Sequence, residues 1–271
     1  MWGREQVIDV EGLPLRVVRA GSGPPLLLIN GIGAPAEMWA PIVARLDGHE
    51  VVAFDLPGAG ASPPLRRPTR MRGLAELVTR LIDALGYERI DVLGYSFGGI
   101  LAQELARRSP ERVDRLVLCA TCPGLTSAPP QPLAALLMLT PARYSGRSVA
   151  SRIVPLIAGG RTRRDPTALR EHLAERLARP PSTQGYLQQL YAVSGWSSLC
   201  WLSSIGHETL IMVGDEDPLI RVINARCMAA LMPRSRLRVV RGGGHLFLLD
   251  EPGSVVADLT GFLATASRAT E

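Results

Sequence analysis

The chain contains no lysine: all 30 basic residues among its 271 positions are arginine. Without a side-chain amine the protein cannot form a Schiff base, build a Walker-type phosphate loop or use a Ser-Lys dyad. The arginines are mostly scattered among Asp and Glu and are not interleaved with aromatic residues. The net charge of +5 therefore indicates a solvated surface, and we expect no nucleic-acid partner.

Cysteine is also scarce, and long apolar runs are missing. Among the four cysteines only Cys119 and Cys122 are close in sequence, and no second pair or nearby His completes a metal or redox site. We interpret these two as packing residues at a strand end. Residues 1–6 lack the apolar core of a signal peptide, and no run reaches transmembrane length. We therefore expect a cytoplasmic protein without a metal, a cofactor or a membrane span.

Short apolar runs alternate with helical patterns through most of the chain, whose 46% hydrophobic content is enough for one large core. After an opening hairpin over 6–10 and 13–20, the expected strands are 25–29, 50–54, 90–93, 115–119, 209–213 and 236–240. The expected helices are 38–46, 71–85, 100–107, 224–232 and 250–264. This alternation predicts the α/β class, with a mostly parallel central sheet and helices on both faces.

The alternation stops in the middle of the chain. Residues 124–205 contain no strand-like run, but they include an apolar segment at 133–139 and an amphipathic segment at 166–178. Because strands resume afterwards, we interpret 124–205 as a helical cap inserted into one core domain, formed by 1–123 and 206–271.

The segment Gly94–Gly98 has the sequence Gly-Tyr-Ser-Phe-Gly between a predicted strand and a predicted helix. This is the context of the G-x-S-x-G nucleophile elbow, a tight and strained turn that presents the serine hydroxyl. Glycine at 94 and 98 avoids a clash of a Cβ with the neighbouring strand or helix. Ordinary glycine-rich turns share this pattern, so the interpretation of Ser96 as a nucleophile depends on the rest of the chain.

An acid and an imidazole follow two later strands, in the chain order Ser96, Asp217, His245. The carboxyl ends of parallel strands meet at one edge of a sheet, so these side chains are expected to meet. His245 would take the serine proton, and Asp217 would fix the imidazole tautomer and stabilise its charged form. Asp215 competes with Asp217, but the Gly-x-x-Asp spacing favours Asp217, and we expect Asp215 to cap the turn. The other histidines are expected at the surface: His49, His172 and His207.

Two backbone N–H groups are candidates for an oxyanion hole. The Phe97 N–H lies at a predicted helix N-terminus beside Ser96, where it faces any anion formed there. The Ile32 N–H lies in the glycine-flanked loop that follows the strand 25–29. We expect the two groups to pair around a tetrahedral oxyanion.

Together these motifs resemble the α/β-hydrolase superfamily over the whole chain; they are Asn30–Gly33, Asp55–Ser62, Gly94–Gly99, Gly214–Asp217 and Gly244-His245. A narrower resemblance is to intracellular depolymerases of medium-chain poly(3-hydroxyalkanoates), and several of its motifs lie within 124–205. Its motifs are Asn30–Ala34, Gly159-Gly160, Arg163–Pro166, Gly185-Tyr186, Gly195-Trp196, Trp201-Leu202, Gly214–Ile220 and Gly244–Leu248.

The resemblance implies a serine esterase that cleaves small or polymeric aliphatic esters through an acyl-enzyme on Ser96. The cap would act as a lid, and the expected substrate pocket comprises Tyr95, Leu136, Leu139, Trp196, Trp201 and Leu246. A carbon–carbon bond hydrolase and a cofactor-free haloperoxidase-like enzyme use the same triad and remain alternatives. An epoxide or haloalkane hydrolase is disfavoured because it needs a carboxylate at position 96. The alternative outside enzymes is a catalytically silent ligand receptor.

Overall fold

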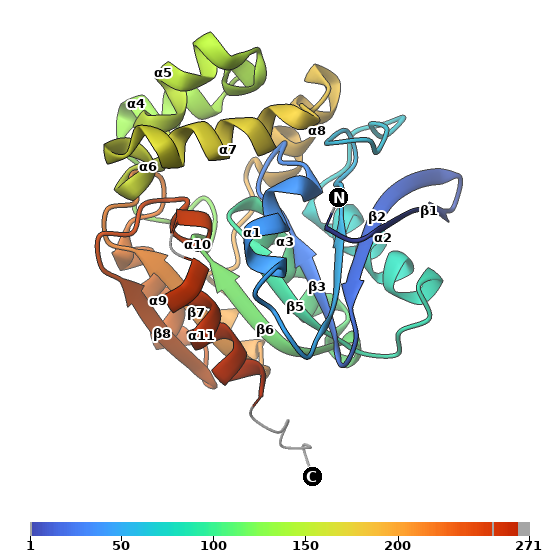
Figure 1. The fold of residues 1–271 in the computed structure, drawn as a ribbon. Coiled ribbons are helices and arrows are strands. Elements are labelled where there is room, and N and C mark those ends of the chain that lie inside the picture. The colour runs from blue at the N-terminus through green and yellow to red at the C-terminus, as the bar shows by residue number, and fades with distance from the viewer. Residues whose placement is uncertain (1, 251, 265–271) are drawn as a thin grey trace.

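A single eight-stranded sheet runs through the computed structural model, which describes residues 2–250 and 252–264 (Figure 1). Its strands are β1 (Arg4–Val10), β2 (Leu13–Gly21), β3 (Pro25–Ile29), β4 (Glu50–Phe54), β5 (Ile90–Tyr95), β6 (Val113–Cys119), β7 (Glu208–Gly214) and β8 (Ser235–Val240). Their order is β1-β2-β4-β3-β5-β6-β7-β8. The hairpin partners β1 and β2 are antiparallel, β2 is antiparallel to β4, and every later pairing is parallel. The predicted α/β class and mostly parallel sheet are confirmed.

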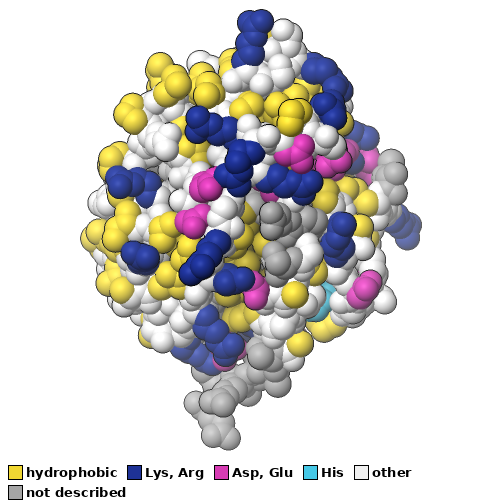
Figure 2. Space-filling view, turned by 60° about the vertical axis from the view of Figure 1, so that its left-hand side comes forward, with side chains coloured by type: hydrophobic (Ala, Val, Ile, Leu, Met, Phe, Trp, Pro, Cys, Tyr) yellow, Lys and Arg dark blue, Asp and Glu magenta, His cyan; other side chains and the backbone are white. Residues whose placement is uncertain are grey.

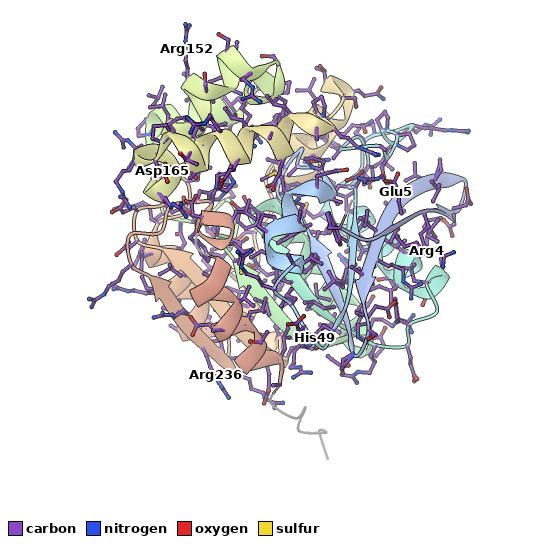
Figure 3. The ribbon with its side chains drawn as sticks, in the orientation of Figure 1. Arg4, Glu5, His49, Arg152, Asp165 and Arg236 are labelled. Carbon is purple, nitrogen blue, oxygen red and sulfur yellow. The ribbon has the colours of Figure 1, made fainter. Side chains whose placement is uncertain are left out.

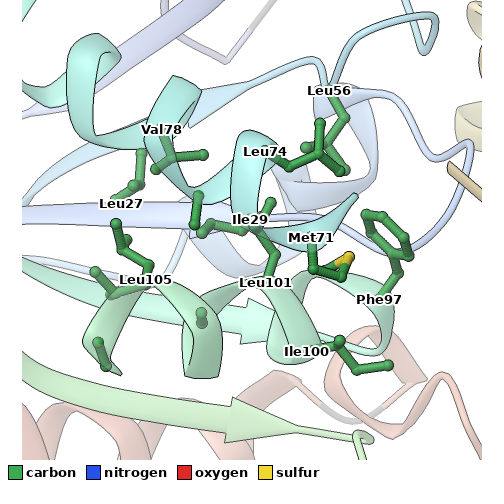
Figure 4. Close-up of a cluster of buried hydrophobic side chains, with 14 of the residues drawn as sticks. Leu27, Ile29, Leu56, Met71, Leu74, Val78, Phe97, Ile100, Leu101 and Leu105 are labelled. Carbon is green, nitrogen blue, oxygen red and sulfur yellow. The ribbon is translucent and has the colours of Figure 1, made fainter. Parts of the chain in front are cut away.

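Helices cover both faces of this sheet. The α-helices of the core are α1 (Ala40–Val43), α2 (Met71–Ala84), α3 (Phe97–Arg108), α9 (Val222–Leu231), α10 (Phe247–Asp250) and α11 (Pro252–Leu263). Side chains of α2, α3 and α9 belong to one buried cluster with one sheet face, and those of α1, α10 and α11 pack in another cluster. Figure 4 shows part of the first cluster, with Leu27 and Ile29 of β3 against α2 and α3.

A group of helices lies over the end of the sheet (Figure 1). They are α4 (Pro132–Met138), α5 (Arg147–Ala158), α6 (Gly160–Arg164), α7 (Pro166–Ala178) and α8 (Thr183–Val193). The two ends of the segment lie together, because Gly124 and Ser197 form an isolated antiparallel bridge and the Leu125 N–H donates to the Trp196 carbonyl at 2.8 Å. The chain segments that lead into and out of this group of helices thus lie side by side.

The differences from the predicted elements have local causes. The expected helix 38–46 is divided into a 3-10 helix, Ala36–Trp39, and α1, because Pro41 cannot continue a hydrogen-bond ladder but suits a first turn. The expected helix 250–264 corresponds to α11, which begins at Pro252, and the short helix α10 precedes it. Helix α5 was not predicted, and it accommodates an internal Pro155. None of the described helices is long and apolar enough to cross a bilayer.

Most of the arginines lie at the surface. On the face shown in Figure 2, arginine side chains are spread across the whole view, with Asp and Glu side chains between several of them. Many form ion pairs with exposed partners, as Arg72 does with Glu76 and Arg238 with Asp258. The positive charge on this face is therefore dispersed and partly neutralised.

Candidate active site

Ser96 lies at the sharp turn between β5 and α3, with φ of 54° and ψ of −116°. A left-handed φ of this kind costs a non-glycine residue about 1–3 kcal/mol, and such strain is concentrated at functional sites. The glycines around it allow close backbone approach: a Cβ on Gly94 would lie 2.4 Å from the Gly98 carbonyl oxygen, and one on Gly98 would lie 2.0 Å from that of Ile29. The Thr121 hydroxyl donates to the Ser96 carbonyl at 2.8 Å and helps to hold the turn.

The structure brings together the serine, histidine and aspartate from three strand ends. Ser96 Oγ lies 3.1 Å from His245 Nε2, and His245 Nδ1 lies 2.7 Å from Asp217 Oδ2. The other carboxylate oxygen, Asp217 Oδ1, accepts the N–H groups of Leu219 at 2.8 Å and Ile220 at 2.9 Å. Asp217 and His245 are both buried. Three hydrogen bonds fix the carboxylate, and one of them also fixes the imidazole. This is the hydrogen-bond geometry that a nucleophile, a base and an orienting acid require.

Asp215 has a different partner. Its Oδ1 accepts the Gly242 N–H at 2.7 Å, so this side chain joins the turn after β7 to the loop after β8. The structure therefore places Asp215 in the turn after β7, where it holds the loop after β8 rather than capping its own turn, and it places Asp217 at the histidine.

The loop after β3 leaves one N–H group free beside the serine. The Gly31 N–H donates to Asn30 Oδ1 at 2.8 Å, the Gly33 N–H to Gln189 Oε1 at 2.8 Å, and the Ala34 N–H to the Gly31 carbonyl at 3.1 Å. Among the described residues, the Ile32 N–H has no acceptor. The loop is thus held by its other groups while this donor stays available.

Phe97 supplies the second candidate donor. It is the first residue of α3, where a backbone N–H has no acceptor within the helix. Its ring is buried in the cluster of α2 and α3, close to Met71 in Figure 4, and this packing anchors the N–H next to Ser96. The N–H groups of Ile32 and Phe97 are thus both without an acceptor among the described residues, and the oxyanion pair stays a prediction.

A small cavity of about 30 Å³ lies at Ser96 and His245. Core and cap both line it, through Gly31, Ile32, Ala34, Met38, Tyr95, Ser96, Met138, Arg143, Tyr144, Ile157, Arg176, Leu219, His245 and Leu246. Of the expected pocket residues, Tyr95 and Leu246 are here. The Tyr95 hydroxyl donates to the His245 carbonyl, and burial, with the charge of Asp217, raises the pKa of Tyr95 well above its usual value.

The other four expected pocket residues do not line this cavity, which corrects the expectation. Leu136 lies in α4 and Leu139 directly follows it. Both side chains point outward and are 62% and 59% exposed. Trp196 and Trp201 face each other edge-on, with ring centroids 5.7 Å apart, in a separate groove between the cap and α3. Trp196 Nε1 donates to Glu104 at 2.9 Å, so this pair joins the cap to the core.

Two of the three histidines expected at the surface are buried, so that expectation was wrong for them. His172 on α7 is only 4% exposed, and its Nε2 lies 2.8 Å from Asp250 Oδ1. His49 is buried in the turn before β4, at the end of the sheet away from the cap (Figure 3). His207 is partly exposed, with Nε2 3.0 Å from the Pro110 carbonyl.

The cysteines are unpaired thiols, and Cys119 is buried at the end of β6. Burial raises the pKa values of Cys119 and Cys122 above the usual range, which keeps both thiols protonated and unreactive. The packing interpretation agrees with this environment.

Sequence reasoning missed the polar residues that the cap places over the cavity, Arg143, Tyr144 and Arg176. A signal for Arg176 was present, because it lies on the same stripe of α7 as His172 and Ala168, at intervals of four residues. Ala168 on this stripe and its neighbour Leu173 mark the buried side of the helix, so the polar members of the stripe face the core. Arg143 and Tyr144 lie in a short 3-10 helix and give no periodic signal.

The fold and the site geometry together define the class. A family model described as "alpha/beta hydrolase fold" matches residues 24–252, so the chain belongs to the α/β-hydrolase family and is a hydrolase. Among curated proteins, the poly(3-hydroxyalkanoate) depolymerase of Ectopseudomonas oleovorans is 42% identical over 240 residues, which cover 88% of this chain and 84% of that protein. An uncharacterized protein of Mycobacterium tuberculosis is 30% identical over 92% of this chain and 78% of its own. A solved hydrolase from Pseudomonas aeruginosa PA01 aligns with a TM-score of 0.81 at 26% identity, covering 97% of this chain and 99% of that one.

Proposed function

We propose that the protein is a serine esterase that hydrolyses aliphatic carboxylic esters, including poly(3-hydroxyalkanoates), through an acyl-enzyme on Ser96. The observation that carries this proposal is the hydrogen-bonded chain from Ser96 through His245 to Asp217 at the floor of the cavity. The 42% identity to a poly(3-hydroxyalkanoate) depolymerase supports the substrate class.

In the first half of the reaction Ser96 Oγ attacks the ester carbonyl while His245 Nε2 takes the hydroxyl proton. The carbonyl oxygen becomes an oxyanion, which the N–H groups of Ile32 and Phe97 stabilise; one such donor typically contributes about 10²–10³-fold in rate. The imidazolium is stabilised by Asp217, and it returns its proton to the leaving alkoxide as the C–O bond breaks.

In the second half a water molecule loses its proton to His245 and attacks the acyl carbon of the ester on Ser96. The second tetrahedral intermediate collapses, releases the carboxylic acid and restores the serine hydroxyl. No step needs a metal or an organic cofactor.

Residues 124–205 act in this proposal as the cap that completes the substrate cavity. Met138 and Ile157, together with Leu219 and Leu246 of the core, supply an apolar lining, which suits an aliphatic chain. An intracellular location is part of the proposal, and the free thiols support it.

The direct test is hydrolysis of p-nitrophenyl esters of graded acyl length by the wild type and Ser96→Ala. We expect activity that peaks at one chain length and falls by more than about 10³-fold in the variant. Clearing of a medium-chain polyester suspension then separates a depolymerase from an esterase of small substrates. Undiminished hydrolysis by Ser96→Ala would refute the nucleophile assignment, and binding of small ligands without hydrolysis of any ester would favour a receptor.

A further inference from the structure

Two arginines of the cap, Arg143 and Arg176, line the cavity at Ser96 and have no carboxylate partner among the described residues. The described residues include four buried arginines: Arg16, Arg115, Arg143 and Arg176. Arg16 pairs with Glu5, Glu37 and Asp55, and Arg115 pairs with Asp91. Arg143 and Arg176 form no ion pair with any described residue, and they are the two that line the cavity at Ser96.

Arg143 is held by neutral groups. It donates to the Tyr186 hydroxyl at 2.5 Å and to the Ile32 carbonyl at 3.0 Å, and it lies over the rings of Tyr144 and Tyr186 at 4.8 and 5.0 Å. The Tyr144 hydroxyl donates to the same Ile32 carbonyl at 2.9 Å. The guanidinium therefore contacts the loop that carries the candidate oxyanion donor, the Ile32 N–H.

Arg176 is less satisfied. It donates only to the Tyr144 hydroxyl, at 3.3 Å, and its buried Nε has no partner among the described residues. Burial, reinforced by the positive charge of Arg143, lowers the pKa of Arg176. An arginine stays protonated even so, which means that the cavity contains an uncompensated charge.

A buried guanidinium without a carboxylate partner is unfavourable for stability, which indicates a functional role. Burying an unpaired charge costs several kcal/mol, and buried charges are normally paired. The nearest catalytic carboxylate, Asp217, is already fixed by His245, Leu219 and Ile220, so it cannot serve as the counterion. An anion that enters the cavity with the substrate would supply the missing partner.

We propose that Arg143 and Arg176 bind a free carboxylate of the substrate, so that the enzyme prefers esters that carry a carboxylate a few bonds from the scissile bond. This proposal rests on the proposed esterase function and specifies its substrate. Among hydroxyalkanoate esters, only the unit at the carboxyl end of a chain has a free carboxylate. That unit is the alcohol side of the last ester bond.

The reaction at that bond is an ordinary hydrolysis. The last C–O ester bond breaks, water supplies OH to the acyl side and H to the leaving alkoxide, and a 3-hydroxy acid anion is released. Its carboxylate stays ionised throughout and contacts the guanidinium groups by charge-assisted hydrogen bonds. The enzyme would thus remove single units from the carboxyl end.

The test compares a 3-hydroxyoctanoate dimer with its methyl ester, in which the carboxylate is blocked and the scissile ester is unchanged. We expect the wild type to cleave the free acid with a kcat/KM about 10- to 100-fold higher, the range expected for hydrogen bonds to a charged group. In Arg176→Gln the ratio of the two kcat/KM values should fall towards one, and Arg176→Lys should retain part of it. Because the test uses a ratio, a general loss of activity in the variant cancels.

The matched control is Arg152→Gln, which removes an equal charge from the exposed side of α5, where the side chain points away from the body of the protein (Figure 3). It should keep the wild-type ratio. A wild-type ratio near one, or a ratio unchanged in Arg176→Gln, overturns the proposal; the arginines would then only support the Ile32 loop.

A binding measurement separates this proposal from the esterase function. Isothermal titration of Ser96→Ala with 3-hydroxyoctanoate should give binding that weakens by at least 10-fold when Arg176→Gln is added. If no ester is hydrolysed but this binding is seen, the esterase function fails and the carboxylate site stands. If esters are hydrolysed but binding is absent or insensitive to Arg176, the carboxylate site fails alone.

Discussion

The helices over the sheet are joined to the proposed catalytic His245 by direct backbone contact, and this makes Gly160 a sensitive position. Gly160 has a φ of 51°, and a Cβ placed there would lie 2.2 Å from the nitrogen of Gly244, next to His245. The His245 N–H itself donates to the Ala158 carbonyl at 2.5 Å. We predict that Gly160→Ala lowers kcat by moving the imidazole, although residue 160 does not contact substrate.

The expected decrease in kcat follows from two free-energy costs of the added methyl group. The left-handed backbone costs a residue with a Cβ about 1–2 kcal/mol, and the clash costs about 1–3 kcal/mol unless Gly244 moves away. Displacement of Gly244 carries His245 with it, and a misplacement of about 1 Å in a catalytic group can cost about 10²-fold in rate. We therefore expect kcat to fall by about 10- to 100-fold, with a smaller change in KM.

The assay is steady-state hydrolysis of a p-nitrophenyl ester, with the thermal midpoint measured in parallel. The matched control is Gly195→Ala, which has a similar φ of 75° but no atom within 4 Å of the added Cβ. It should lower stability by the backbone term while kcat stays near wild type. Equal effects of the two variants on kcat would contradict the proposed coupling between cap and histidine.

Three further predictions concern the acid, a half-buried glutamate and the core. Asp217→Asn should lower kcat by about 10⁴-fold with little change in KM, since the imidazole loses its tautomer and its stabilising charge; a loss under 10-fold would contradict the assignment. Burial, with Glu171 nearby, raises the pKa of Glu175 to about 7, so the unfolded chain ionises at lower pH and stability falls as pH rises from about 4.5 through 7. Glu175→Gln should thus raise the unfolding free energy by about 1–3 kcal/mol at pH 8 but hardly at pH 4, which thermal melts at the two pH values would show. A gain in stability that is independent of pH would refute this. Leu101→Ala, at a fully buried position of α3, should lower the unfolding free energy in urea by about 2–5 kcal/mol, and a loss below 1 kcal/mol would show that the cluster in Figure 4 tolerates a cavity.

The core of the fold could be predicted because its strands are short apolar runs bounded by glycine and proline. The strands 25–29 and 50–54 agree with β3 and β4 in their limits, and the segment 166–178 agrees with α7. The three residues at the strand ends could also be predicted, because parallel strands bring their carboxyl ends to one edge. Topology alone places Ser96, Asp217 and His245 at that edge.

The lining of the cavity could not be predicted in the same way. In α4 nearly every position is apolar, so sequence does not tell which side faces inward, and Leu136 proved to be outside. Trp196 and Trp201 satisfy each other and Glu104, a contact between distant segments that no local pattern indicates. His172 was assigned by polarity to the solvent and Arg176 was missed, whereas their position on the stripe of α7 decides their burial.

The most direct test of the central claim is covalent labelling of the nucleophile. The wild-type protein is treated with a fluorophosphonate, and the modified residue is identified by mass spectrometry of its peptides. We predict one adduct, on Ser96, with loss of esterase activity in proportion to labelling, and no adduct in Ser96→Ala. Labelling of another residue that abolishes the activity, or full activity in a protein labelled on Ser96, would contradict it.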